Sequence, residues 1–91
     1  MQPPPRNPPV ADAAPTESAL TDYDRLHLVT YLRLLDAAAE GADWQEVVKI
    51  VLRIDPAEEP DRARRVWESH LARARWMTES GYRHLLHGPP N

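Results

Sequence analysis

The sequence contains no cysteine and only three glycines among its 91 residues. Without cysteine the chain cannot build a disulfide framework, a zinc ribbon or a thiol nucleophile. Each glycine falls at an expected helix end, so no glycine-rich loop is present to bind phosphate. No run of about 18 apolar residues is found, so no membrane span is expected. The N-terminus also lacks the pattern of a signal peptide.

Catalytic and metal-binding patterns are also missing. None of the four histidines belongs to a His-Glu-x-x-His motif. His84 and His87 have adequate spacing for a metal, but no acidic residue or cysteine lies close to them in sequence. His70 is expected to be a hydrogen-bonded core histidine. The sequence therefore predicts no enzyme, no metal or other cofactor and no small-molecule ligand.

Proline divides the chain into a tail and a domain. Six of the ten prolines lie in residues 1–19, which have little to bury and are expected to be disordered. Residues 20–87 are expected to fold as one helix-turn-helix-like domain, and residues 88–91 to fray.

Three helices are expected, over about 21–41, 43–55 and 60–81. Thr21 and Asp24 have the spacing of a capping box at the start of the first expected helix. In the first helix, apolar residues recur on one arc: Leu28, Tyr31, Leu32, Leu35, Ala38 and Ala39. The second helix opens at Asp43, with Glu46 completing a second box, and its apolar residues leave it nearly enclosed.

The third helix carries an inner arc of core candidates: Ala63, Val66, Trp67, His70, Leu71, Ala74 and Met77. The connector before it, residues 54–60, is longer than a usual helix-turn-helix turn. The predicted fold class is therefore all-α, a small three-helix helix-turn-helix variant with an extended turn. A short C-terminal helical lid is expected over residues 82–86.

Charge is distributed unevenly along the folded part. Residues 36–61 hold eight acids and two bases, a net charge of −6, and residues 62–87 hold six arginines and two acids, a net of +4. An acidic patch in and after the connector, Asp55, Glu58, Glu59 and Asp61, would meet DNA phosphates with like charge. The outer face of the third helix instead resembles a recognition helix, through Arg62, Arg65, Ser69 and Arg73.

Three apolar residues favour a protein partner instead. Leu26 and Val29 lie off the apolar arc of the first helix, and Trp76 lies off the inner arc of the third. Exposed aromatic and arginine side chains are typical anchors of protein interfaces. The lid could cover Trp76, and a homodimer could use the same apolar residues, so both alternatives stay open.

Three stretches of residues 20–87 are distinctive when taken together: Gly41-Ala42-Asp43-Trp44, Trp67-Glu68-Ser69-His70-Leu71 and Gly81-Tyr82-Arg83-His84-Leu85-Leu86. Through them, residues 20–87 resemble a family from proteobacterial mobile elements that was long catalogued as a domain of unknown function. They look most like the QseM-type antiactivators of integrative and conjugative elements.

This resemblance implies a protein with an extended-turn helix-turn-helix fold that represses the conjugative, horizontal transfer of a mobile element. The protein is expected to lie in the cytoplasm. Such an antiactivator occupies the N-terminal domain of a transcriptional activator in place of the activator's own domain, and it can contact a LuxR-type quorum-sensing regulator. The acidic charge, and the absence of a predicted domain before residue 20, match the stand-alone form, so weak or absent DNA binding is expected. The expected protein-binding residues are Leu26, Val29, Thr30, Arg33, Trp76, Tyr82 and Arg83. The alternative is a DNA-binding regulator that uses Arg62, Arg65, Ser69 and Arg73.

Overall fold

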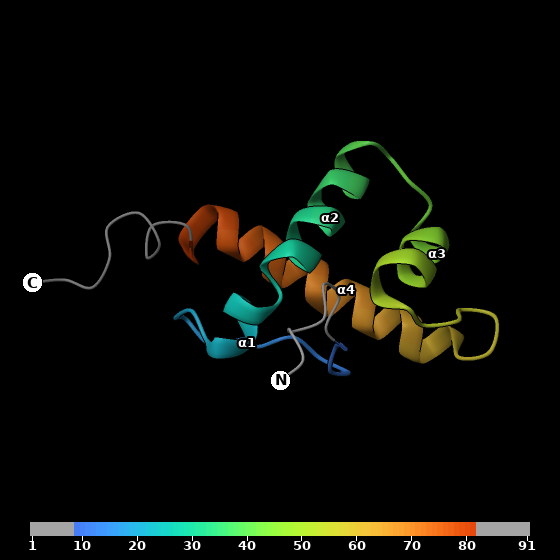
Figure 1. Cartoon of the computed structure of the whole chain (residues 1–91), viewed down its shortest axis with the longest axis horizontal. Coiled ribbons are helices and arrows are strands. Elements are labelled where there is room, and N and C mark those ends of the chain that lie inside the picture. The colour runs from blue at the N-terminus through green and yellow to red at the C-terminus, as the bar shows by residue number, and fades with distance from the viewer. Residues whose placement is uncertain (1–8, 82–91) are drawn as a thin grey trace, which may run out of the picture.

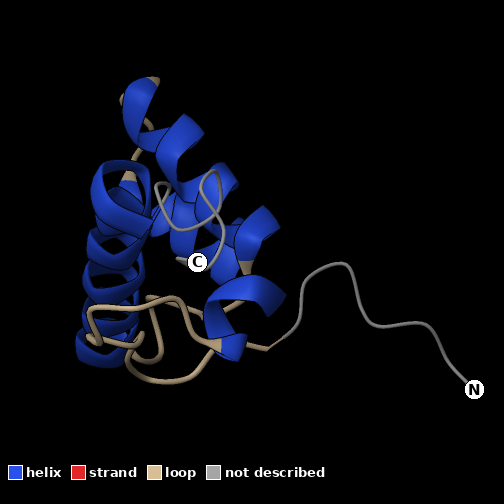
Figure 2. Ribbon diagram, turned by 90° about the vertical axis from the view of Figure 1, so that its left-hand side faces the viewer, coloured by secondary structure: helices blue, strands red, loops and turns tan. Residues whose placement is uncertain are grey.

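The computed structural model describes residues 9–81, and this part of the chain is helical with no strand. Figure 1 shows the helices in order: α1 (Asp22–Leu26), α2 (Leu28–Ala39), α3 (Trp44–Val47) and α4 (Pro60–Trp76). α3 continues into a wider π-helical turn, η1 (Val48–Leu52), and α4 into another, η2 (Met77–Gly81). The predicted all-α class is confirmed (Figure 2). The predicted lid lies outside the described residues, and no helix within residues 9–81 is long and apolar enough to cross a membrane.

The longest helix, α4, organises the core because it packs against both α2 and η1 (Figure 1). It begins with Pro60 in its first turn, where a missing N–H costs nothing. Its predicted inner arc is confirmed at five buried positions, with Trp67 and Met77 only half-buried: Ala63, Val66, His70, Leu71 and Ala74. The core is completed by Leu34 of α2 and by Val48 and Leu52 of η1.

The first predicted helix is in fact two helices, broken at His27. The backbone of His27 (φ −106°, ψ 21°) leaves the helical region. Its ring nitrogens lie 2.8 Å from the carbonyl oxygen of Tyr23 and 3.1 Å from that of Pro9. These contacts draw the buried ring toward α1 and the N-terminal segment, and they accompany the change of direction. The capping box of Thr21 and Asp24 forms as predicted.

The buried face of α2 differs from the predicted apolar arc, as if the helix were rotated about its axis. Thr30, Tyr31 and Leu34 face the core, whereas Leu32 is 60% exposed and Ala38 and Ala39 are exposed. The expectation that Thr30 belongs to a binding surface is therefore wrong. The roll follows from Tyr31, whose hydroxyl donates to buried Asp24 at 2.8 Å and so holds this face of α2 inward.

The second predicted helix ends where the backbone of Arg53 turns left-handed (φ 59°), after η1. Asp43 stands at the N-cap position of α3, but its side chain makes no capping hydrogen bond. The helix is not nearly enclosed, because Ile50 is 65% exposed.

The N-terminal segment, residues 9–19, packs against α1 and α4 where the sequence predicted a disordered tail. Ala14 is buried, and its backbone N–H donates to the Ser69 hydroxyl at 3.1 Å. Asp12 pairs with Arg62 at 2.8 Å. The composition of the segment gave no sign of these contacts, which come from α4 rather than from local propensity.

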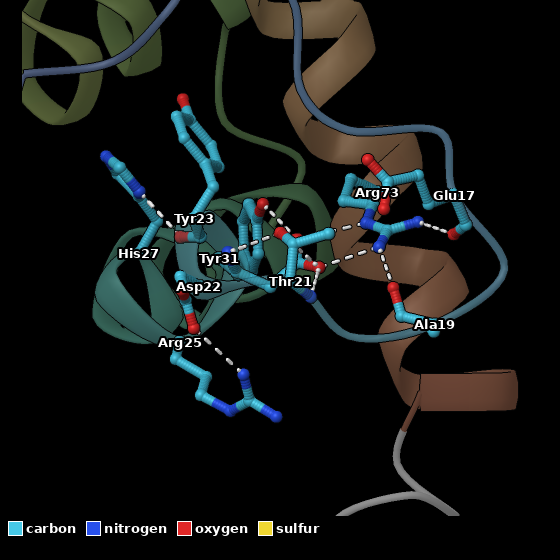
Figure 3. Close-up of polar contacts among 10 residues, drawn as sticks. Glu17, Ala19, Thr21, Asp22, Tyr23, Arg25, His27, Tyr31 and Arg73 are labelled. Atoms are coloured by element: carbon cyan, nitrogen blue, oxygen red, sulfur yellow. Dashed lines mark hydrogen bonds and ion pairs between the residues drawn. The ribbon is translucent and has the colours of Figure 1, made fainter.

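Asp24 and Arg73 form a buried ion pair between α1 and α4. Arg73 donates to both carboxylate oxygens, from Nη2 at 2.6 Å and from Nε at 3.0 Å, the bidentate geometry that makes such pairs strong. Its Nη1 also donates to the carbonyl oxygen of Glu17 at 2.6 Å, and its Nη2 to that of Ala19 at 2.9 Å (Figure 3). One guanidinium thus joins α1, α4 and the N-terminal segment.

The hydrogen bonds around Asp24 keep its carboxylate charged. Burial by itself raises the pKa of Asp24, but the hydrogen bonds from Arg73, the Thr21 backbone and Tyr31 outweigh it and lower the pKa from 3.8 to about 2. Because the folded pKa lies below the unfolded one, the ionised pair stabilises the fold above about pH 4. That contribution is lost as the pH falls toward 2.

We expect Asp24→Asn to lower the free energy of unfolding by about 3–5 kcal/mol, because it leaves the Arg73 charge buried without an oppositely charged partner. Urea denaturation followed by circular dichroism measures the change. The control is Asp22→Asn, which removes a solvent-exposed pair with Arg25 and should leave the urea midpoint unchanged. Equal stability of Asp24→Asn and the unchanged chain would contradict the assigned role of this pair.

Candidate nucleic-acid interface

Helix α3 with η1, a connector over residues 53–59, and α4 form a helix-turn-helix arrangement with a long turn. In such motifs the second helix enters the DNA groove, and its N-terminal half reads the bases. The buried face of α4 is held against α2 and η1, which leaves an opposite face outward. We call this outward face the α4 outer face: Asp61, Arg64, Arg65, Glu68, Ala72 and Arg75, all of them exposed.

Arg64 is held at one edge of this face by three side chains. Its guanidinium carbon lies over two indole rings, 4.9 Å from the centre of Trp44 and 5.0 Å from that of Trp67. Its Nε donates to the carboxylate of Glu68 at 2.7 Å. The sequence analysis did not single out Arg64, although the four-residue spacing to Glu68 is a recognisable signal of a helical ion pair.

Arg65 and Arg75 make no ion pair with any other residue in the 9–81 range. Ten residues separate them on α4, a rise of about 15 Å. The helix therefore presents two available positive charges along its outer face.

Two of the other predicted DNA contacts, Arg62 and Ser69, are bound by residues of the N-terminal segment. The Arg62 guanidinium pairs with Asp12 at 2.8 Å and with Glu59 at 3.0 Å, and these two acids hold the pKa of Arg62 above its ordinary value. The Ser69 hydroxyl donates to the carbonyl oxygen of Val66 and accepts from the N–H of Ala14. Of the four predicted residues, only Arg65 is therefore both exposed and unengaged within the described chain.

The prediction that Arg73 belongs to the outer face is wrong. Only 4% of Arg73 is exposed, because its guanidinium turns inward to Asp24 and to two backbone carbonyls. The sequence analysis placed Arg73 outside because a charged residue is rarely buried without a partner. Its partner, Asp24, lies 49 residues away in sequence.

The acidic patch is exposed at all four predicted positions: Asp55, Glu58, Glu59 and Asp61. Asp55 accepts a hydrogen bond from the N–H of Ala57 at 2.9 Å, which shapes the connector. Glu59 pairs with Arg62. The patch lies at the N-terminal end of α4, beside the arginines of the outer face.

The predicted protein-binding residues are only partly brought together. Leu26 and Val29 are 56% and 50% exposed, and Arg33 is also exposed. Trp76 is half-buried, with the Arg73 guanidinium 3.8 Å from its ring centre, and it lines a hollow with Ala14 and Pro15 of the N-terminal segment. Tyr82 and Arg83 lie outside the described residues.

Leu32 joins Leu26 and Val29, although the sequence analysis placed it in the core. Leu32 lines an apolar groove of about 260 Å³ between α2 and the C-terminal end of α4. Leu28, Leu35, Ala74 and Met77 line the same groove. We use the name α2 apolar face for Val29 and Leu32 of α2 together with Leu26 at the end of α1.

His70 is the hydrogen-bonded core histidine that the sequence predicts. Its Nδ1 lies 2.7 Å from the carbonyl oxygen of Val66, and its Nε2 contacts the Tyr23 hydroxyl. Burial lowers the pKa of His70 and so favours the neutral ring. Across residues 9–81 no three His, Cys, Asp or Glu side chains gather as a metal site requires.

A family model described as the DNA-binding domain of a T6SS transcription factor matches residues 7–87. The chain belongs to this family. Among curated proteins, none matches the chain.

The family match covers the N-terminal segment as well as the helices, in agreement with the packing of residues 9–19 on α4. It supports a transcription regulator with a DNA-binding type of domain. The expectation that DNA binding is weak or absent finds no support in this match.

Proposed function

We propose that the protein regulates transcription in the cytoplasm by binding duplex DNA with the α4 outer face, without enzymatic activity. The observation that carries the proposal is Arg65, an exposed arginine in the N-terminal half of the second motif helix with no ion-pair partner among the described residues. Phosphate contacts from such residues supply much of the affinity of a protein for DNA. The family match agrees with this role.

The acidic patch opposes DNA binding and so limits its strength. Glu58 is exposed and has no ion-pair partner within residues 9–81, so its charge is not offset locally. Like charges facing a phosphate backbone weaken association and also disfavour unsuitable partners. We infer a modest affinity that depends strongly on salt.

An antiactivator role is a second candidate, favoured by the α2 apolar face together with the acidic patch. Leu26, Val29 and Leu32 are large apolar residues that are each at least half exposed on neighbouring helices. Exposed large apolar side chains of this kind are typical of protein interfaces. In this proposal the face binds the N-terminal domain of a transcriptional activator, or a LuxR-type regulator, and transfer of a mobile element is repressed.

We expect Arg65→Ala to weaken binding to a labelled mixed-sequence duplex and to reduce the slope of log affinity against log salt by about 0.9, one phosphate contact. Fluorescence anisotropy at several salt concentrations measures both quantities. Arg25→Ala is the matched control, because it removes an exposed arginine from α1. If the two variants bind equally, the α4 outer face is not the DNA surface.

Glu58→Gln should strengthen binding to the same duplex, because it removes one repulsive charge and breaks no ion pair within residues 9–81. Glu46→Gln, at an exposed acid of α3, provides the control for net charge. An equal gain from both variants would mean that only total charge matters and that the connector does not approach the backbone.

For the second candidate, Val29→Asp combined with Leu32→Asp should abolish binding to an activator's N-terminal domain in calorimetry. The control is Ile50→Asp, which changes another exposed large apolar residue, on η1. Binding that survives in the double variant, with circular dichroism unchanged, excludes this face.

A further inference from the structure

We propose that Arg64 is the base-reading residue of the α4 outer face and that it recognises a guanine in the major groove. This inference rests on the proposed function and adds the chemical identity of the base. It is carried by the two indoles and the carboxylate that hold Arg64, an arrangement found at no other arginine within residues 9–81.

The three contacts leave one end of the guanidinium available. The Glu68 carboxylate accepts a hydrogen bond from Nε, so it occupies the side of the guanidinium nearest the Arg64 backbone. The Nη1 and Nη2 atoms make no hydrogen bond to any other residue described here, and the side chain of Arg64 is 48% exposed. A guanidinium anchored through Nε presents its two Nη donors together at its outer end.

The two rings restrict where that end can point. The centres of Trp44 and Trp67 are 5.9 Å apart, with their planes inclined by 40°, and the guanidinium carbon is about equally distant from both. Cation–π contacts on both rings favour this position over the many others open to an arginine side chain. Less side-chain entropy is therefore lost when a ligand is bound.

Guanine is the base that such a group fits. Its N7 and O6 atoms are two acceptors side by side in the major groove, and bidentate arginine is the commonest partner for them. Arg64 lies in the second turn of α4, within the half of a recognition helix that reads bases. Arg65, by contrast, has no such anchors and suits a backbone phosphate.

The test begins with duplexes selected from a random library by the full chain. Each guanine of the selected sequence is then replaced by 7-deazaguanine, which lacks the N7 acceptor, and affinities are measured for the unchanged chain and for Arg64→Lys. Lysine keeps the charge but loses the planar fork. Arg25→Lys is the matched control on α1.

At one guanine, we expect the replacement to weaken the unchanged chain and Arg25→Lys by roughly ten-fold, and Arg64→Lys by much less. Glu68→Gln should also reduce this discrimination, since Nε loses its charged acceptor. If Arg64→Lys discriminates as well as the unchanged chain at every guanine, the inference is wrong, and a loss of overall affinity in Arg65→Ala would still support the proposed function. If the unchanged chain selects no duplex and binds none, both proposals fail.

Discussion

The structure depends on one buried ion pair, between Asp24 of α1 and Arg73 of α4. The guanidinium also binds two carbonyl oxygens of the N-terminal segment, so three parts of the chain meet at one side chain. Because Arg73 points inward, the ion pair helps to fix which face of α4 packs against the rest of the domain. In this orientation Arg64 and Arg65 lie on the exposed face. The pair that stabilises the fold therefore also positions the candidate DNA surface.

Local signals in the sequence predict most of the helical framework. Pro60 begins α4, Gly41 follows α2 with a left-handed backbone (φ 71°), and Thr21 with Asp24 forms the capping box. These signals work because each depends on neighbours a few residues away. The roll of α2 could not be predicted in this way, since the buried hydrogen bond from Tyr31 to Asp24, and not apolar periodicity, decides which face turns inward.

The candidate site was predicted less well, for a related reason. A charged residue on a helix is expected to be exposed, and only the tertiary structure shows that Arg73 has a buried partner and that Arg62 has Asp12. Whether an arginine can contact a nucleic acid thus depends on which groups of the same chain its guanidinium already binds. Arg62 and Arg73 are neutralised by acids of the same chain, whereas Arg65 is available and Arg64 is held but open at its Nη end.

The most direct test of the account is a nuclear magnetic resonance titration of the full chain with a mixed-sequence duplex, following backbone amides and arginine side chains. We predict that the largest shifts fall on Arg64, Arg65 and Glu68 and that they disappear at high salt, as expected for phosphate contacts. Val29 and Leu32 should stay unchanged. Shifts confined to the α2 apolar face, or no shifts at any salt concentration, would contradict DNA binding through α4.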